Sequence, residues 1–196
     1  MIESLEIVDR QIVLFINGFH NSWSDQFMWI VSQRVTWIPF YMMLIFLLYQ
    51  KHTVKTASLV IIIIVAMIAL TDFLSVQLFK EVFLRYRPSH NVLIKNQLHL
   101  HEFDDGTFYY GGLYGFISSH AANFSAIVTF YILKMKWKWY FNALLCLAPI
   151  LVGYSRIYLG VHYLSDILVG FLYGFVTALV FYQFIYVKIE KKFELK

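Results

Sequence analysis

Charged residues are scarce in this chain and make up only 14% of its 196 residues. Soluble domains usually carry about 25%. Hydrophobic residues make up 60%, and a chain of this length lacks the interior to bury so much apolar surface in water. The composition therefore excludes a water-soluble globule and a disordered chain. It indicates an integral membrane protein whose outer surface is covered by lipid.

Cysteine is almost absent as well, because Cys146 is the single one and lies in an apolar run. A disulfide scaffold is therefore excluded. The net charge of +4 is too small to indicate a nucleic-acid partner, and we expect none. The positions of the charges carry more information than their sum.

Stretches without a charged residue outline the membrane spans. They cover residues 35–50, 56–71, 106–133, 139–155 and 167–187. A helix needs about 20 residues to cross roughly 30 Å of hydrocarbon, so the shorter stretches extend into their flanks. The sequence predicts spans near 27–50, 56–79, 117–134, 139–155 and 164–187. We expect an all-α, polytopic membrane bundle that forms one domain over residues 1–196.

The N-terminal stretch 5–31 is amphipathic and contains tryptophan and phenylalanine, which favours a helix that lies in the membrane interface. A sixth span within 11–31 is the alternative, and Asp25 and the polar turn 18–22 argue against it. The expected number of transmembrane helices is therefore five to six.

Lysines fall in alternate connections of the predicted bundle, which places them all on one side. They are Lys51, Lys55, Lys134, Lys136, Lys138, Lys188, Lys191, Lys192 and Lys196. The positive-inside rule makes this side cytoplasmic, together with the C-terminus. The N-terminus, a long loop over 89–116 and the turn 156–163 are expected on the outer side.

Polar side chains concentrate at the outer ends of the spans. They occur in LFKEVFLRYRPSH (78–90), YGFISSHAAN (114–123) and GYSRIYLGVHYLSD (153–166). Lys80, Arg87 and Arg156 break the positive-inside tendency, and a phosphate is a natural partner for such charges. Taken alone, each of these residues could anchor the helix end to lipid headgroups. Because three polar strings lie on the same side, a phosphate-binding site is favoured.

These residue types support phosphoryl chemistry. Guanidinium and ammonium groups stabilise charge on phosphoryl oxygens, and a helix that starts at Ser118 adds backbone N–H donors. His162 and Asp166 are four residues apart and therefore lie on one helical face. They can act as a nucleophile and its orienting carboxylate, or they can form a structural hydrogen-bonded pair. His120 can protonate a leaving oxygen. No acidic cluster of the kind that holds Mg²⁺ is present, and we expect neither a metal nor another cofactor.

The three strings resemble the signature of the type 2 phosphatidic acid phosphatase superfamily of membrane lipid phosphatases. Its first and third parts match completely, at Lys80, Arg87, Pro88, Ser155, Arg156, His162 and Asp166. In its second part Ser118 and His120 match, whereas Ile117 and Ser119 stand where the family has proline and glycine. Serine is tolerable there if φ is negative, because only a positive φ would strain it.

The resemblance implies a role for each matching residue. His162 would attack phosphorus to form a phosphohistidine, Asp166 would orient it, and His120 would protonate the leaving group. The phosphoryl oxygens would be bound by Lys80, Arg87, Ser118, Ser119 and Arg156. The expected function is that of a metal-independent phosphatase for a lipid phosphate: undecaprenyl diphosphate, phosphatidylglycerol phosphate, phosphatidic acid or a lipid A phosphate. The resemblance also implies a bacterial inner membrane, with the site facing the periplasm.

Two other functions are alternatives. A small anion transporter would place charges at mid-membrane depth and show paired repeats, which this chain lacks. An inactive lipid-phosphate-binding protein would not need His120, His162 and Asp166 together.

Four further features lead to smaller predictions. The string at 99–105 (HLHEFDD) fits a solvated loop better than a metal site. Tyr109, Tyr110 and Tyr114 are expected in an aromatic belt at the membrane surface. Asp72 should pair with a neighbour inside the bundle, and Arg85 either touches substrate or anchors the surface.

Overall fold

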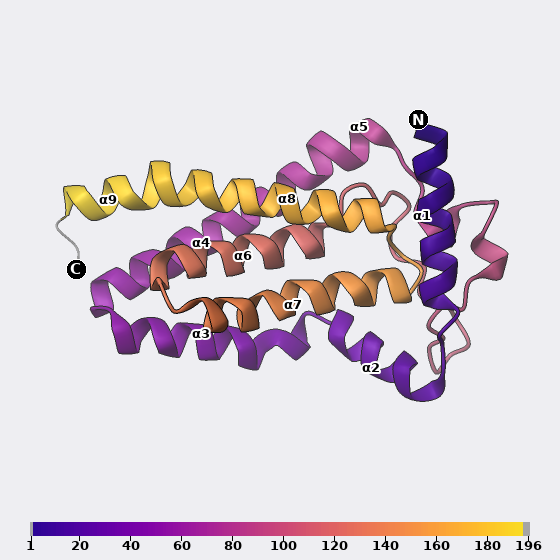
Figure 1. Cartoon of the computed structure of the whole chain (residues 1–196), viewed down its shortest axis with the longest axis horizontal. Helices are drawn as coiled ribbons and strands as arrows, with labels where there is room; N and C mark the ends of the chain where they lie inside the picture. The colour runs from indigo at the N-terminus through magenta and orange to yellow at the C-terminus, as the bar shows by residue number, and fades with distance from the viewer. Residues whose placement is uncertain (1, 194–196) are drawn as a thin grey trace.

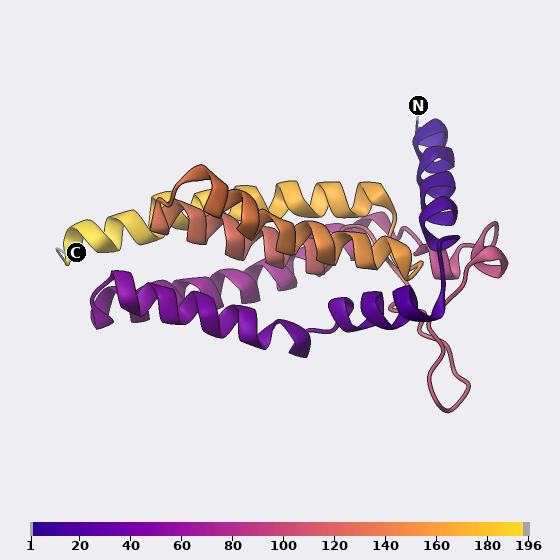
Figure 2. The ribbon, with the colours of Figure 1, turned by 60° about the horizontal axis from the view of Figure 1, so that its bottom comes forward.

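The structure is a computed structural model that describes residues 2–193, and it consists of helices joined by loops (Figure 1). Within these residues no β-strand forms, apart from two isolated bridges in the loops. The all-α prediction is therefore confirmed. The long helices run side by side as a bundle, and Figure 2 shows the same arrangement from another direction.

Five helices make up the bundle. They are α3 (Ile38–Lys51), α4 (Val54–Ser75), α6 (Ser119–Met135), α7 (Trp139–Tyr158) and α8 (Leu164–Val180). Two of them continue through a π-helical turn into a short helix: α4 through Val76–Lys80 into α5 (Glu81–Phe83), and α8 through Phe181–Tyr186 into α9 (Val187–Lys192). These helices coincide with four of the predicted spans to within a few residues.

Three continuous helices in the described part of the chain are long and apolar enough to cross a membrane. They are Val54–Phe83, Trp139–Tyr158 and Leu164–Lys192. The 17 residues of α6 span about 26 Å at 1.5 Å per residue, and this helix packs against α4, α7 and α8. It therefore lies among helices that shield much of it from lipid.

The predicted span 27–50 is wrong as a single helix. The chain forms α2 (Ser22–Ser32), a 3₁₀ turn over Val35–Trp37 and then α3, with a bend of 73° between the two halves. Side chains beyond the break satisfy the last carbonyls of α2, because Thr36 Oγ1 donates to Ile30 O at 2.6 Å and Trp37 Nε1 donates to Val31 O at 2.8 Å. Pro39 in the first turn of α3 favours a new helix start there.

Helix α1 (Ile2–Asn17) runs across the end of the bundle rather than along it (Figures 1 and 2). Its last residue fastens it there, because the Asn17 side chain donates to the carbonyls of Tyr158 and His99, each at 2.7 Å. The loop between α5 and α6 lies at the same end. The connections α3–α4 and α6–α7 and helix α9, which carry the lysines, lie at the other; Lys196 is outside the described residues.

Two glycines set the distance between α6 and α8. A Cβ on Gly174 would lie 2.0 Å from the Ala122 carbonyl oxygen, and one on Gly170 would lie 2.8 Å from the Ser118 carbonyl oxygen. Only glycine permits such a close backbone approach, which is the small-xxx-small packing of membrane helices. The contact places the N-terminus of α6 beside the N-terminus of α8.

Candidate active site

The end of the bundle that α1 crosses brings the three polar strings together. The first string ends α4–α5 and enters the loop between α5 and α6, the second starts α6, and the third is the α7–α8 turn. All the sequence-predicted site residues lie at this end. They are Lys80, Arg87, Ser118, Ser119, His120, Arg156, His162 and Asp166.

His162 is held on both ring nitrogens. Its Nδ1 lies 3.4 Å from Asp166 Oδ2, and its Nε2 lies 3.0 Å from Arg87 Nη1. Only 1% of the residue is exposed. Burial and the positive charges of Arg87 and Arg156 keep the pKa of His162 well below its ordinary value, so the imidazole is neutral at neutral pH. A neutral ring with a carboxylate on Nδ1 is suited to nucleophilic attack from Nε2, once Arg87 donates to a phosphate oxygen instead of to this nitrogen.

Asp166 is fixed by groups that the motif does not contain. Arg85 Nη1 donates to Asp166 Oδ1 at 2.8 Å, and the backbone N–H of Tyr163 donates to Oδ2 at 3.0 Å. Arg85 in turn contacts Asp9 of α1, with Nη2 to Oδ2 at 2.8 Å. The Ser165 backbone N–H donates to Asp9 Oδ1 at 3.1 Å. The Arg85 guanidinium is thus bound by two carboxylates, and sequence reasoning missed Asp9 entirely.

The Arg87 guanidinium is buried in a pocket of carbonyls. Its Nη1 donates to Val161 O at 3.1 Å, and its Nε donates to Tyr114 O at 3.2 Å. Gly111, at φ +67°, would place a Cβ only 3.0 Å from Arg87 Nη1, so a side chain there would displace the guanidinium. Burial and the Arg156 charge lower the pKa of Arg87 to about 10, which leaves it charged at neutral pH.

The start of α6 presents backbone donors next to an ammonium group. Ser118 is the N-cap of the helix and its hydroxyl oxygen accepts from the Ala121 N–H at 3.4 Å, which leaves its O–H able to donate to a ligand. By their positions in the first turn, the N–H groups of Ser119 and His120 have no acceptor within the helix. Lys80 Nζ donates to Ser119 Oγ at 2.8 Å. Ser119 has a negative φ, so serine in place of the family's glycine carries no backbone strain.

Arg156 is 2% exposed and is oriented by two hydroxyl groups. Its Nη2 donates to the Tyr109 hydroxyl at 3.0 Å, and its Nη1 contacts Ser32 Oγ at the end of α2. Its Nε is buried without a hydrogen-bond partner, which leaves a donor for a ligand. Tyr109 is therefore one of the groups that orient this guanidinium. No sequence pattern links Ser32 or Tyr109 to Arg156.

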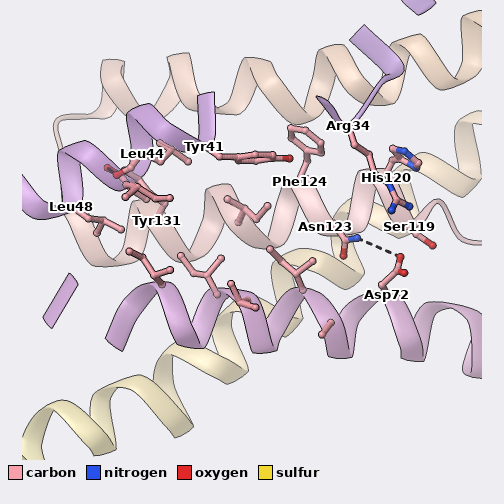
Figure 3. A pocket seen from close by; sticks show the side chains of 17 residues that line it. Arg34, Tyr41, Leu44, Leu48, Asp72, Ser119, His120, Asn123, Phe124 and Tyr131 are labelled. Atoms are coloured by element: carbon pink, nitrogen blue, oxygen red, sulfur yellow. Dashed lines mark hydrogen bonds between the residues drawn. The ribbon is translucent and has the colours of Figure 1, made fainter. Parts of the chain in front are cut away.

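His120 lies at the polar end of an elongated apolar cavity of about 460 Å³ between α3, α4 and α6 (Figure 3). Leucine, isoleucine and aromatic side chains line most of its length. Asp72 and Asn123 meet at this polar end with a 3.5 Å contact, which confirms the predicted pairing of Asp72. Among the described residues His120 makes no side-chain hydrogen bond, so its ring is available to a ligand in the cavity.

One group outside this site has the residue types of a metal centre. His20, Asp25 and His99 place one donor atom each within 4.8 Å of one another. The two imidazoles are stacked, with centroids 4.0 Å apart and an interplanar angle of 13°. Nitrogen lone pairs lie in the ring plane, so nearly parallel stacked rings cannot both direct them at one ion. Asp25 already accepts from Tyr158 at 2.6 Å, and its contact with His99 links α2 to the loop between α5 and α6.

Known proteins resemble this chain in sequence and in fold. The family model of the PAP2 superfamily matches residues 58–190. Lipid A 4′-phosphatases of Porphyromonas gingivalis and Bacteroides thetaiotaomicron are each 30% identical to the chain; the matches cover 90% and 93% of this chain and 72% and 79% of those proteins.

Two crystal structures share the fold. A PAP2-type phosphatidylglycerolphosphate phosphatase from Bacillus subtilis aligns with a TM-score of 0.65 at 19% identity, over 92% of this chain and 86% of that one. Aquifex aeolicus LpxE aligns with a TM-score of 0.59 at 23% identity, over 88% of this chain and 93% of that one.

Because the family model matches more than half of its residues, the chain belongs to the PAP2 superfamily. It is a multi-pass membrane phosphatase.

Proposed function

We propose that this protein removes a phosphate group from lipid A, or from a closely related lipid phosphate, at the outer face of a bacterial inner membrane. The observation that carries the proposal is the buried His162–Asp166 pair beside three cationic side chains, next to an apolar cavity that reaches into the bundle. The cations suit a phosphate, and the cavity suits a hydrocarbon chain. The two lipid A 4′-phosphatases among the relatives favour lipid A over the other candidate lipids.

The proposed reaction has two displacements at phosphorus. Lys80, Arg87 and Arg156 bind the phosphoryl oxygens, together with the N–H groups at the start of α6. His162 Nε2 attacks phosphorus while Asp166 holds the proton on Nδ1. The bond from phosphorus to the ester oxygen breaks, and His120 gives its proton to that oxygen. Water then attacks the phosphohistidine, His120 takes up a proton, and inorganic phosphate leaves with His162 restored.

The proposed topology has five crossings, formed by α3, α4–α5, α6, α7 and α8–α9. Helices α1 and α2 lie at the outer interface, and the C-terminus is cytoplasmic. The lysines at the end opposite the site support this orientation through the positive-inside rule. A phosphate at the outer end would then lie at the water boundary while its lipid chains stay in the bilayer.

The experiment is phosphate release by purified protein in detergent with EDTA. The substrates are a lipid A phosphate, undecaprenyl diphosphate, phosphatidylglycerol phosphate and phosphatidic acid. We expect release from lipid A to exceed the others, His162→Ala to lower it by about 10³-fold or more because the nucleophile is lost, and Asp166→Asn to lower it less. Release that is unchanged in His162→Ala would refute the mechanism, and strong inhibition by EDTA would refute metal independence.

A further inference from the structure

Arg34 lies at the break between α2 and α3, outside every motif that the sequence analysis used. The extended backbone of Gln33 ends α2, and the exposed Arg34 follows it at the 73° bend, where its side chain lines the cavity of the active site. Figure 3 shows the guanidinium directed toward His120 at the polar end of this cavity.

This guanidinium has no protein partner. In the part of the chain that the structure describes, no carboxylate lies within 4.0 Å of Arg34, and no side-chain hydrogen bond involves it. Arg85 and Arg156, by contrast, are bound by carboxylates or hydroxyls. The carboxylate of this cavity, Asp72, contacts Asn123 instead. Arg34 therefore adds an uncompensated positive charge to a site that already holds enough cations for one phosphate.

The side on which Arg34 lies follows from the two histidines, and this step rests on the proposed function. In an in-line displacement the attacking and leaving atoms lie on opposite sides of phosphorus. His120, which would protonate the leaving oxygen, lines the same cavity as Arg34, whereas His162 does not line it. Arg34 is thus on the side of the leaving group, away from the nucleophile.

We propose that Arg34 is a specificity-determining residue that binds a second anionic group on the leaving-group side of the substrate. In a lipid diphosphate this anion is the inner phosphate, which departs with the lipid. In a doubly phosphorylated lipid it is the second phosphate. A guanidinium binds either one through paired N–H donors. A lipid with a single phosphate monoester offers it no anion, and Arg34 then contributes little.

Arg34→Gln tests the proposal, with Arg34→Lys as the conservative variant. Lys95→Gln is the matched control, because Lys95 is an exposed cation of the outer loop that does not line this cavity. Phosphate release is measured on a lipid monophosphate, the diphosphate of the same lipid, and mono- and bis-phosphorylated lipid A. We expect Arg34→Gln to lower kcat/KM by about 10- to 100-fold on the lipid diphosphate, on bis-phosphorylated lipid A, or on both, according to which second phosphate Arg34 binds. On the two monophosphorylated lipids the loss should be less than threefold. Arg34→Lys should restore part of the loss, and Lys95→Gln should behave like wild type.

A binding measurement keeps this test separate from the proposed reaction. The His162→Ala protein is titrated with mono- and bis-phosphorylated lipid A, with and without Arg34→Gln. We expect the second substitution to weaken binding of the bis-phosphorylated lipid by about tenfold and to leave the other unchanged. Equal losses on all lipids, or no loss on any, would overturn the role of Arg34. Selective binding without turnover in the wild-type protein would instead refute the phosphatase mechanism and retain Arg34.

Discussion

His162 illustrates how the neighbours of a residue, and not its type, prepare it for chemistry. A histidine in water is about half protonated near pH 6.5. Here the ring is buried between Arg87 and Asp166, and the burial together with the nearby guanidinium groups lowers its pKa. The same groups that can bind a phosphate therefore also keep the proposed nucleophile free of its proton.

This lowered pKa predicts the acidic limb of the pH profile. Protonation removes the nucleophile as pH falls through the pKa of His162, and that pKa lies below its ordinary value. We expect kcat/KM, corrected for ionisation of the substrate phosphate, to fall only below about pH 6.5. A steady-state profile from about pH 4 to about pH 8 measures it. A midpoint above about 6.5 would show that His162 is not in the environment described above.

Asp9 is predicted to act on the site through Arg85. Asp9→Asn keeps the size of the side chain but removes the charge that holds Arg85 at 2.8 Å, and Arg85 in turn holds Asp166. We expect a loss of about 1 to 3 kcal/mol in stability and a lower kcat with a nearly unchanged KM. Thermal unfolding in detergent and steady-state kinetics measure these effects.

Glu6→Gln is the matched control on the same helix. Glu6 pairs with Arg10 four residues on, at 3.5 Å and with nearly half of its side chain exposed. Such exposed pairs contribute little, so this variant should resemble wild type. Equal effects of the two substitutions would mean that α1 as a whole, and not Asp9, supports the site.

At the scale of elements, the position of α6 against α8 decides whether the motifs meet. The two helices are far apart in sequence terms, and Ser118 at the start of one donates its backbone N–H to the Asp166 carbonyl at the start of the other, at 3.0 Å. Gly170 and Gly174 make that approach possible. The break between α2 and α3 plays a similar part, since it brings Ser32 to Arg156 and Arg34 to the cavity.

Gly174→Ala is predicted to damage both fold and activity. The new Cβ would lie 2.0 Å from the Ala122 carbonyl oxygen, which belongs to a helix backbone and cannot move by itself. We expect a loss of about 1 to 3 kcal/mol or more, seen as a lower unfolding temperature and lower phosphate release. Val176→Ala is the control, because that side chain is exposed on the same helix. A Gly174→Ala protein as stable as wild type would show that the helices are not so closely packed.

The whole molecule has two chemically different ends. The end with α1, α2 and the loop between α5 and α6 holds the site, and the other end holds the lysine-rich connections. Lys134 there is paired with Glu190 at 3.2 Å. A lipid phosphatase needs this polarity, because one end must meet headgroups while the apolar flanks stay in the bilayer.

Labelling with a membrane-impermeant maleimide tests which end faces outward. Asp105→Cys in the outer loop and Lys191→Cys near the C-terminus are both exposed positions, and Cys146→Ser removes the native thiol. We expect Asp105→Cys to react in intact spheroplasts and Lys191→Cys to react only after permeabilisation. The reverse pattern would place the site on the cytoplasmic side.

The chemistry-bearing residues were largely predictable from the sequence, and their partners were not. His162 and Asp166 are four residues apart, so helical geometry alone puts them on one face. Arg85 and Asp9 are 76 residues apart and meet only in the fold. The α2–α3 break was missed because an apolar stretch with few charges predicts only that lipid surrounds it. Such a pattern does not show that the side chains of Thr36 and Trp37 bind the last carbonyls of α2 and so allow the helix to end there.

The sequence by itself therefore determined that the chain is a helical membrane protein with one polar end, because composition and charge placement fix which segments lipid can surround. It also indicated the residues of a phosphoryl site through short-range motifs. The tertiary structure alone decided how these residues are oriented, which cations are already neutralised and which, like Arg34, remain free. Those properties depend on contacts between distant segments, and packing, not local sequence, sets such contacts.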